Sequence, residues 1–564
     1  MRPVQRRPVP GRRAVAARCL AVLVTGLAAL LVLGALTLPE RLEQLDLRAF
    51  VRLPLEAIVY LAVVLALPGR FRGVRTGLAL AAGVVLALSA VFKVLDLGFR
   101  EALNRPFDVL IDWRYAGSLV ETARDSVGEG RGTLLLVGAA LVLVALLVLV
   151  PLSVLRLTRV ASLHRRPAER TVATLAGLWL VLAVLHVQGE AGPIASHDTA
   201  GYVYGHVSRI PGELRDHREF RRAAQTDPLR DVGTDQLLTG LRGKDVLLVF
   251  VESYGRVAVE GSSFSPGVNA VLDAGTARLR EEGFASRSAF VTSPTFGAIS
   301  WLAHATLQSG LWSDSQQRYD VLVTSPRLTL SSLFERAGWR TVASVPANNR
   351  DWPQGEFYGF DQLYDSRNLG YEGPRFGYPT MPDQYTLDAF HRLELAPAPR
   401  PPVMAEIDLI TSHAPWSRTP RLLDQAAVGD GSAFDGMPEQ LPSEADIWPS
   451  PTRVKAAYGH SIEYTLRALV RFVTTYGDDD LVLVLVGDHQ PATIVSGADA
   501  GHDVPIALVA RDPAVLDRTA DWGWDAGLRP RPDAPVWRMD AFRDRFVAAY
   551  SSSGHTGTQP ASVR

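Results

Sequence analysis

The chain has 564 residues, of which 47% are hydrophobic, and a formal net charge of −1 at pH 7. That length exceeds one ordinary domain, and the apolar content is too high for a purely soluble protein. A balanced charge without a basic stripe excludes a nucleic-acid-binding protein. The only cysteine, Cys19, excludes a framework of disulfides.

The apolar excess is confined to the N-terminal third. Five segments there mostly approach the roughly 20 residues that cross a bilayer. They are residues 19–38, 53–68, 76–92, 133–155 and 171–187. The second is short and carries Glu56, which a tilted helix or a thinned bilayer accommodates. We therefore expect a membrane domain over residues 1–190 with five transmembrane helices.

Arginine-rich flanks predict the orientation of these helices, because positive flanks stay in the cytoplasm. Such flanks occur in residues 2–13, 70–75 and 156–170. An odd number of helices then places the C-terminal part on the other side. We expect a multi-pass protein of the plasma membrane whose C-terminal domain is extracytoplasmic.

After about residue 195 the sequence alternates between strand and helix signals. This pattern is typical of an α/β fold with a mixed, mostly parallel sheet sandwiched by helices. Expected strands are residues 245–251, 286–291, 340–345, 403–410, 481–486 and 505–509, and expected helices are residues 328–337 and 461–474. The polar, irregular residues 191–242 are predicted to be a linker, and residues 243–564 the exported domain. Residues 418–451 are predicted to form a long loop.

Two of the expected strands end in residues that bind metals. Glu252 follows the strand 245–251, and Asp488 and His489 follow the strand 481–486. In open α/β sheets, ligands bind beyond the carboxyl ends of parallel strands, so these side chains are expected to face one site. Carboxylates, an imidazole and a hydroxyl together suit zinc or manganese better than calcium.

The segment 292–301 lies between the two acidic strand ends and supplies a hydroxyl. It is predicted to leave a strand and to open a helix, with Thr295 at the helix N-terminus. Unpaired N–H groups and the helix dipole favour an anionic substrate at that point. A neighbouring metal would activate the hydroxyl as a nucleophile. Thr292 and Ser293 remain alternative nucleophiles.

In this order, these residues resemble the sulfatase-like branch of the alkaline phosphatase superfamily, in particular lipoteichoic acid synthases and lipid A phosphoethanolamine transferases. The resemblance covers nearly the whole chain, including five N-terminal transmembrane helices. It implies that Glu252, Thr295, Asp488 and His489 bind a divalent cation. It also implies that Thr295 attacks a lipid phosphodiester, carries the head group as a phospho-threonine and passes it to an acceptor hydroxyl.

The same resemblance suggests further site residues. His413 follows an expected strand and His502 precedes the last one. Either is expected to stabilise the phosphoryl oxygens or to protonate the leaving alcohol, because imidazoles titrate near neutral pH. Asn349, Arg350 and Trp352 fall where lipoteichoic acid synthases read their glycerol head group, and are candidate substrate-binding residues.

Three departures from these families limit what the resemblance implies. Pro346 stands where the family has a histidine before the paired asparagines, which weakens the case for glycerol phosphate. Residues 292–296 lack the modifiable residue and the arginine of the Cys/Ser-x-Pro-x-Arg motif, which disfavours sulfatase chemistry. The disulfides common in phosphoethanolamine transferases are absent.

The sequence thus predicts a membrane-anchored, metal-dependent phosphotransferase. It would move a phospho-alcohol head group, of the glycerol phosphate or phosphoethanolamine type, from a membrane phospholipid to a glycan, glycopolymer or lipid acceptor. One alternative is a hydrolase of phosphodiesters or sulfuric esters that uses the same metal and threonine. Another is a non-catalytic envelope sensor or scaffold that retains the fold.

Overall fold

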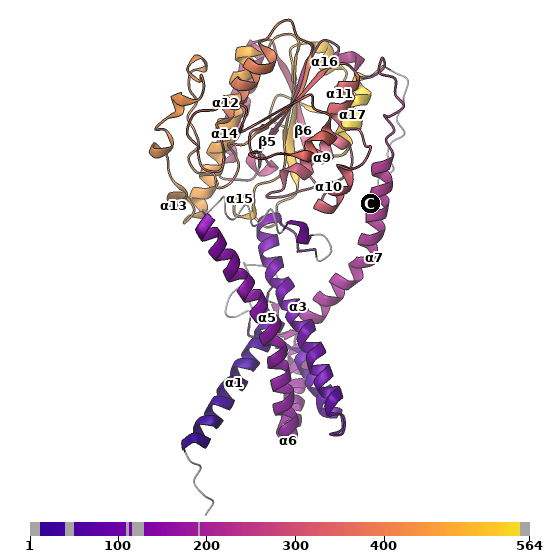
Figure 1. Ribbon diagram of the computed structural model, residues 1–564, viewed down its shortest axis with the longest axis vertical. Helices are drawn as coiled ribbons and strands as arrows, with labels where there is room; N and C mark the ends of the chain where they lie inside the picture. The colour runs from indigo at the N-terminus through magenta and orange to yellow at the C-terminus, as the bar shows by residue number, and fades with distance from the viewer. Residues whose placement is uncertain (1–11, 40–49, 109–111, 116–128, 190–191, 553–564) are drawn as a thin grey trace, which may run out of the picture. The chain divides into compact units, whose positions relative to one another are not determined.

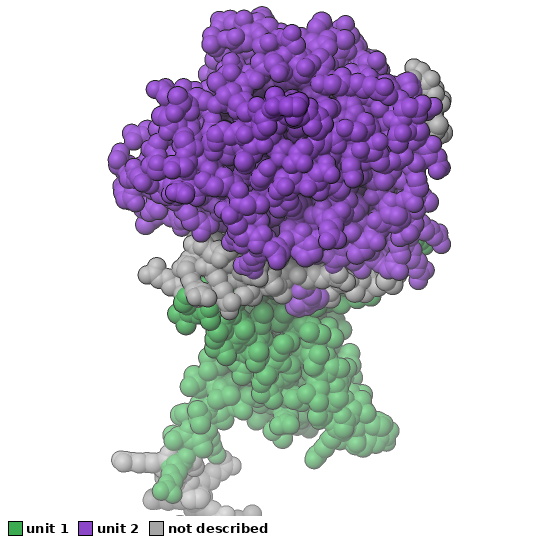
Figure 2. Space-filling view, turned by 45° about the horizontal axis from the view of Figure 1, so that its top comes forward, with its two compact units in different colours: residues 1–100, 105–109, 116–215 green, residues 101–104, 110–115, 216–564 purple. Residues whose placement is uncertain are grey.

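The computed structural model describes residues 12–39, 50–108, 112–115, 129–189 and 192–552. The chain divides into two compact units (Figure 2). Unit 1 comprises residues 1–100, 105–109 and 116–215, and unit 2 comprises residues 101–104, 110–115 and 216–564.

Four helices that begin in unit 1 are long and apolar enough to cross a membrane. They are α1 (Arg12–Thr37), α3 (Arg72–Leu103), α5 (Glu129–Leu163) and α6 (Arg165–Val184). The second of the five expected segments forms α2 (Leu55–Ala66), which has 12 residues. At 1.5 Å per residue, α2 is only about 18 Å long, short of a hydrocarbon core of roughly 30 Å. Among the described residues, four of the five expected segments therefore have the required length.

The predicted irregular linker is largely helical instead. Helix α7 (Asp198–Gln225) occupies more than half of residues 191–242 and is shared between the two units. Its sequence lacks the apolar stripe that indicates an amphipathic helix, because polar and charged residues occur on all faces of α7. Two pairs of short strands also belong to unit 1: β1 (Leu53–Pro54) with β4 (Ala195–Ser196), and β2 (Gln188–Gly189) with β3 (Gly192–Pro193).

Unit 2 is built on a nine-stranded sheet, in the order β12-β6-β11-β10-β5-β9-β7-β8, with β13 paired to β6. The strands are β5 (Asp245–Val251), β6 (Ala285–Thr292), β7 (Arg340–Val345), β8 (Gln362–Asp365), β9 (Val403–Leu409), β10 (Leu481–Gly487), β11 (Asp503–Ala510), β12 (Asp525–Ala526) and β13 (Val536–Arg538). The five strands from β10 to β8 are parallel, and β11 is antiparallel to both of its neighbours. All six expected strands are present, and the mixed, mostly parallel sheet is confirmed.

Helices cover both faces of this sheet (Figure 1). On one side lie α8 (Ser265–Glu281), α12 (Asp383–Phe390) and α14 (Pro451–Tyr476), and on the other α9 (Ser300–Ser309), α11 (Leu330–Arg336), α16 (Pro513–Asp517) and α17 (Ala541–Tyr550). Shorter helices are α10 (Gln316–Leu322), α13 (Glu444–Ile447) and α15 (Thr493–Ser496). The expected helices 328–337 and 461–474 correspond to α11 and the second half of α14.

The central strand β5 is buried on both faces, which explains its unbroken apolar sequence. Its alternate residues enter two separate hydrophobic clusters. Leu247, Val249 and Val251 pack with α8 and α14, whereas Val246, Leu248 and Phe250 pack with α9 and α11. Glu252 continues the second series, so its side chain emerges on the α9 side of the sheet.

A buried ion pair joins the start of unit 2's main segment to its last helix. Arg543 of α17 donates to Asp227 Oδ2 at 2.8 Å and to Oδ1 at 3.3 Å, and both side chains are fully buried. Arg327 lies 3.2 Å from the same carboxylate. Burial would raise the pKa of Asp227, but Arg543 and Arg327 hold it below its usual value.

We expect Arg543→Met to destabilise the chain strongly, because it leaves a buried carboxylate with one cation. The expected loss is about 3–5 kcal/mol of unfolding free energy. The measurement is the thermal unfolding of the full-length chain in detergent. The control is Arg529→Met, which removes an exposed pair with Asp273 and should change stability by about 0–1 kcal/mol. Equal effects of the two substitutions would contradict the prediction.

Candidate metal centre and nucleophile

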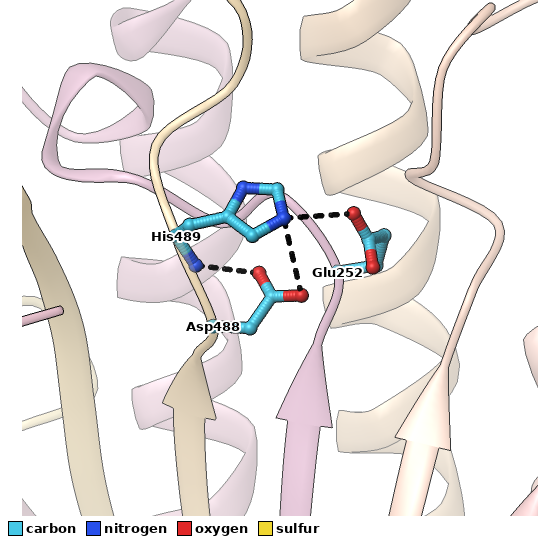
Figure 3. A group of neighbouring side chains, drawn as sticks. All are labelled: Glu252, Asp488 and His489. Atoms are coloured by element: carbon cyan, nitrogen blue, oxygen red, sulfur yellow. Dashed lines mark hydrogen bonds and ion pairs between the residues drawn. The ribbon is translucent and has the colours of Figure 1, made fainter. Parts of the chain in front are cut away.

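Three side chains of types that can bind metals meet at the carboxyl ends of two neighbouring parallel strands. The pairing of β5 with β10 aligns Val251 with Gly487, so Glu252 and Asp488 emerge side by side. His489 follows, and its imidazole points at both carboxylates (Figure 3). The imidazole Nε2 lies 3.3 Å from Glu252 Oε1 and 3.7 Å from Asp488 Oδ2. All three residues are buried.

Gly487 allows this close approach of the two strand ends. A Cβ atom at this position would lie 2.0 Å from the carbonyl oxygen of Tyr254, which follows Glu252 on the other chain segment. No side chain tolerates such a distance from backbone. Glycine is therefore required at position 487 because any side chain would clash with the backbone of Tyr254, and not because the backbone has an unusual conformation.

The orientation of the three residues fits a metal ion. Asp488 Oδ1 accepts the backbone N–H groups of Ser253 at 2.7 Å and His489 at 2.6 Å. The other oxygen, Oδ2, is buried without a hydrogen bond. His489 Nδ1 lies 2.8 Å from the carbonyl of Gln490, so Nε2 is the nitrogen that could bind an ion. Atoms bound at about 2.1 Å to one ion lie roughly 3.0–3.4 Å apart, close to the separations observed here.

Burial and mutual charge shift the pKa of each of the three groups. Burial raises the pKa of Asp488, and the charge of Glu252 raises it further. Burial would lower the pKa of His489, but Asp488 and Glu252 raise it above its usual value. Burial would also raise the pKa of Glu252, but His489 and His413 hold it well below its usual range. Because a ligating imidazole must be neutral, metal binding at this cluster would compete with protonation of His489.

The hydroxyl that meets this cluster belongs to Ser300. Its Oγ donates to Glu252 Oε2 at 2.8 Å and lies 3.2 Å from His489 Nε2. Ser300 is the first residue of α9, where unpaired N–H groups and the helix dipole favour negative charge. The preceding Ile299 has φ 70° and ψ 45°, a left-handed conformation that a β-branched residue adopts only under strain. Ser300 is thus held at the cluster by an unusual turn.

The expected position of Thr295 at the start of the helix is wrong. Strand β6 ends at Thr292, and Phe296 then forms a bridge with Gln490 before α9 begins. The Thr295 hydroxyl donates to the carbonyl of Ala298 at 2.6 Å. The alternatives point elsewhere too, since Thr292 donates to Asp503 and Ser293 to the carbonyl of Asp488.

Sequence reasoning missed Ser300, although a signal was present. Ser300 stands immediately before the apolar run that begins at Trp301, which is the usual mark of a helix N-terminus. Thr295 lies further from that run and is followed by Gly297, whose φ is 72°. The glycine indicates a turn rather than a first helical turn.

His413 and His502 come to the same edge of the sheet. His413 follows β9, stacks on Tyr378 with ring centroids 3.8 Å apart, and lies near enough to Glu252 to influence its pKa. His502 directly precedes β11, and its carbonyl accepts the N–H of Ser293 at 2.9 Å. Burial lowers the pKa of His502 below its usual value. Both imidazoles are partly exposed.

The three candidate substrate-binding residues lie beyond β7. Asn349 and Arg350 are exposed. The indole of Trp352 instead packs against Tyr358, with ring centroids 5.3 Å apart, beside a small hydrophobic cluster. Strand β9 separates β7 from the strand that carries Glu252.

Asp383, at the start of α12, fixes the end of β9 just before His413. Its Oδ1 accepts the N–H groups of Ile410 at 2.8 Å and Thr411 at 2.9 Å. Its Oδ2 accepts the hydroxyl of Thr465 at 2.5 Å. Burial raises the pKa of Asp383 to about 6, although these hydrogen bonds oppose the shift.

We expect Asp383→Asn to change how stability depends on pH. An acid whose pKa is raised on folding contributes stability below its unfolded pKa of about 3.9 and loses it as the pH rises through about 6. Relative to Asp383→Asn, the wild-type chain should lose up to about 3 kcal/mol between pH 4 and pH 7. The measurement is the difference in melting temperature at each pH. A difference that stays constant over this range would refute the assignment.

Comparisons with known proteins add the following. No protein-family model matches the chain, and no curated protein sequence matches it. Several solved structures match. Lipoteichoic acid synthase LtaP from Listeria monocytogenes is 14% identical, with 52% of this chain and 71% of that chain covered and a TM-score of 0.35. A protein in the alkaline phosphatase superfamily from Vibrio parahaemolyticus is 16% identical, with 60% and 75% covered and a TM-score of 0.36.

A third match is the C-terminal periplasmic domain of EptC from Escherichia coli in complex with Zn. It is 14% identical, with 48% of this chain and 73% of that chain covered and a TM-score of 0.32. The chain is similar to these three structures, and at such identities and TM-scores nothing about its reaction follows.

Proposed function

We propose that the chain is a membrane-anchored, metal-dependent phosphotransferase with Ser300 as its nucleophile. The observation that carries this proposal is the position of the Ser300 hydroxyl, 2.8 Å from Glu252 Oε2 and 3.2 Å from His489 Nε2. Glu252, Asp488 and His489 would hold a divalent cation, zinc or manganese. A nucleophilic hydroxyl needs such an arrangement, because it is weak at its ordinary pKa.

When bound, the cation would stabilise the alkoxide of Ser300 and polarise a phosphoryl oxygen. Ser300 Oγ then attacks the phosphorus of a lipid phosphodiester. The Oγ–P bond forms as the bond from phosphorus to the lipid alcohol breaks. The departing alcohol gains a proton from His413 or His502, and the proton that Ser300 loses passes to solvent. The N-terminus of α9 favours the negative charge of the phosphoryl group during this step.

The second half of the reaction reverses the first. An acceptor hydroxyl gives up its proton to His413 or His502 and attacks the phosphorus of phospho-Ser300. The head group leaves on the acceptor, and Ser300 Oγ regains a proton from solvent, which restores its hydroxyl. We place this reaction on the extracytoplasmic side of the membrane. The head group would be glycerol phosphate or phosphoethanolamine, and the acceptor a glycan, glycopolymer or lipid.

The four long apolar helices support a lipid donor. A site tethered to a bilayer meets a high local concentration of lipid, which lowers the entropic cost of encounter. The residues after Ser300 are Trp, Leu, Ala and His. They lack the proline and arginine of the sulfatase motif, so phosphoryl transfer is favoured over formylglycine-dependent cleavage of sulfuric esters.

We expect Ser300→Ala to abolish covalent transfer, whereas Thr295→Ala preserves it. The full-length chain in detergent is incubated with manganese or zinc and a panel of phospholipids, without an acceptor. Peptide mass spectrometry should find the head group on Ser300 in the wild type and in Thr295→Ala. When an acceptor is added, the turnover of Ser300→Ala should be lower than that of the wild type by roughly 10³-fold or more.

An adduct that persists in Ser300→Ala and disappears in Thr295→Ala would restore Thr295 as the nucleophile. Continuous release of the lipid alcohol without an added acceptor, abolished by Ser300→Ala, would mean that water is the acceptor and that the chain is a hydrolase. Stoichiometric lipid binding with no chemistry in any variant would sink the catalytic proposal.

A further inference from the structure

We propose that His304, Glu406 and Asp408 form a second divalent-cation site, next to the one formed by Glu252, Asp488 and His489. His304 lies on α9, four residues after Ser300, so these two residues are about 6 Å apart along the helix axis. The mechanism proposed above uses none of these three side chains. This second site does not depend on the identity of the nucleophile or the substrate.

The three side chains have the separations that a shared ion requires. His304 Nδ1 lies 3.1 Å from Glu406 Oε1 and 3.6 Å from Asp408 Oδ1. One ligand atom from each residue lies within 4.8 Å of the others. These values resemble those of the first site, and they suit atoms that bind one ion at about 2.1 Å.

The two carboxylates project into an apolar layer. Glu406 pairs in register with Leu248, and Asp408 with Phe250, so both point to the α9 side of the sheet. That side is otherwise packed with hydrophobic residues such as Leu248, Phe250 and Leu307. The side chains of Glu406 and Asp408 are 1% and 17% exposed. Buried carboxylates are costly unless a counter-charge compensates them.

No lysine or arginine supplies that counter-charge among the hydrogen bonds and ion pairs of the described residues. The side-chain partners of Glu406 are His304 and Gln308, and the partner of Asp408 is His304. Asp408 Oδ1 is buried and accepts no hydrogen bond. An acceptor in that state, aimed at an imidazole nitrogen 3.6 Å away, is best satisfied by a cation between them.

Surrounding residues hold the ligands in place, as in other metal sites. Gln308 Nε2 donates to Glu406 Oε2 at 2.5 Å, which leaves Oε1 facing His304. The backbone N–H of Ser331 donates to Gln308 Oε1 at 3.0 Å and fixes the direction of that amide. Phe250 stacks on the imidazole of His304 with ring centroids 3.8 Å apart.

One imidazole and two carboxylates, completed by water, suit zinc or manganese. Such an ion would tie α9 to β9. Since Ser300 and His304 share one face of α9, it would also fix the Ser300 hydroxyl at the first site. Protonation of His304 is the alternative to a metal ion, because an imidazolium would also compensate the negative charge of Glu406. The two arrangements differ in their metal content, which is measurable.

The test is the metal content of the full-length chain in detergent. The protein is stripped with a chelator, dialysed against buffered Mn²⁺ and analysed for manganese per chain. We expect two ions in the wild type and one in Asp408→Asn. Because Asp408 Oδ1 makes no hydrogen bond, this substitution removes a charge without breaking a hydrogen bond at that oxygen. His304→Gln should also bind one ion.

Two further variants separate this inference from the proposed function. Glu252→Gln should retain one ion, because it damages only the first site. The control Asp273→Asn, which alters an exposed carboxylate, should retain two. One ion in the wild type, lost in Glu252→Gln but kept in Asp408→Asn, would overturn the second site and leave the proposed function intact. One ion that is lost in Asp408→Asn and kept in Glu252→Gln would instead overturn the first metal centre.

Discussion

The parallel pairing of β5 with β10 is the constraint on which the rest of the site depends. These strands are separated by more than two hundred residues, yet their register ends with Val251 opposite Gly487. A shift by one residue would turn Glu252 or Asp488 to the other face of the sheet. The buried apolar sequences of both strands specify this register, because each side chain must enter its own hydrophobic cluster. The packing of side chains along β5 and β10 therefore determines where Glu252 and Asp488 lie.

The strands and the acidic strand ends were predictable from sequence, and the reason is the same in both cases. A central parallel strand is buried on both faces, so it appears as an uninterrupted apolar run such as 245–251 or 481–486. Where the run stops, the chain reaches the edge at which ligands collect. Glu252 and Asp488 could be placed together on this basis without knowledge of any contact.

Other features depend on tertiary contacts that have no local signature. The turn between β6 and α9 is set by the bridge from Phe296 to Gln490, on a different strand. Because of that bridge, α9 begins at Ser300 and not at Thr295. The local sequence at Thr295 did not indicate this. Helix α7 was not predicted because its sequence has no apolar stripe that would indicate a helix. Glu406 and Asp408 did leave a trace, as two charges inside an otherwise apolar strand, but their partner His304 lies a hundred residues earlier.

The close packing at Gly487 has a consequence for how related chains can vary. Its Cα hydrogen faces a carbonyl oxygen, so even alanine would push the ends of β5 and β10 apart. The three ligands could all be retained while their spacing became too wide for one ion. Chains with the same arrangement of these three side chains should therefore be recognised by a small residue before the Asp-His pair as well as by the pair itself. An Asp-His pair preceded by a bulky residue would mark a sheet edge too wide for one ion to be shared.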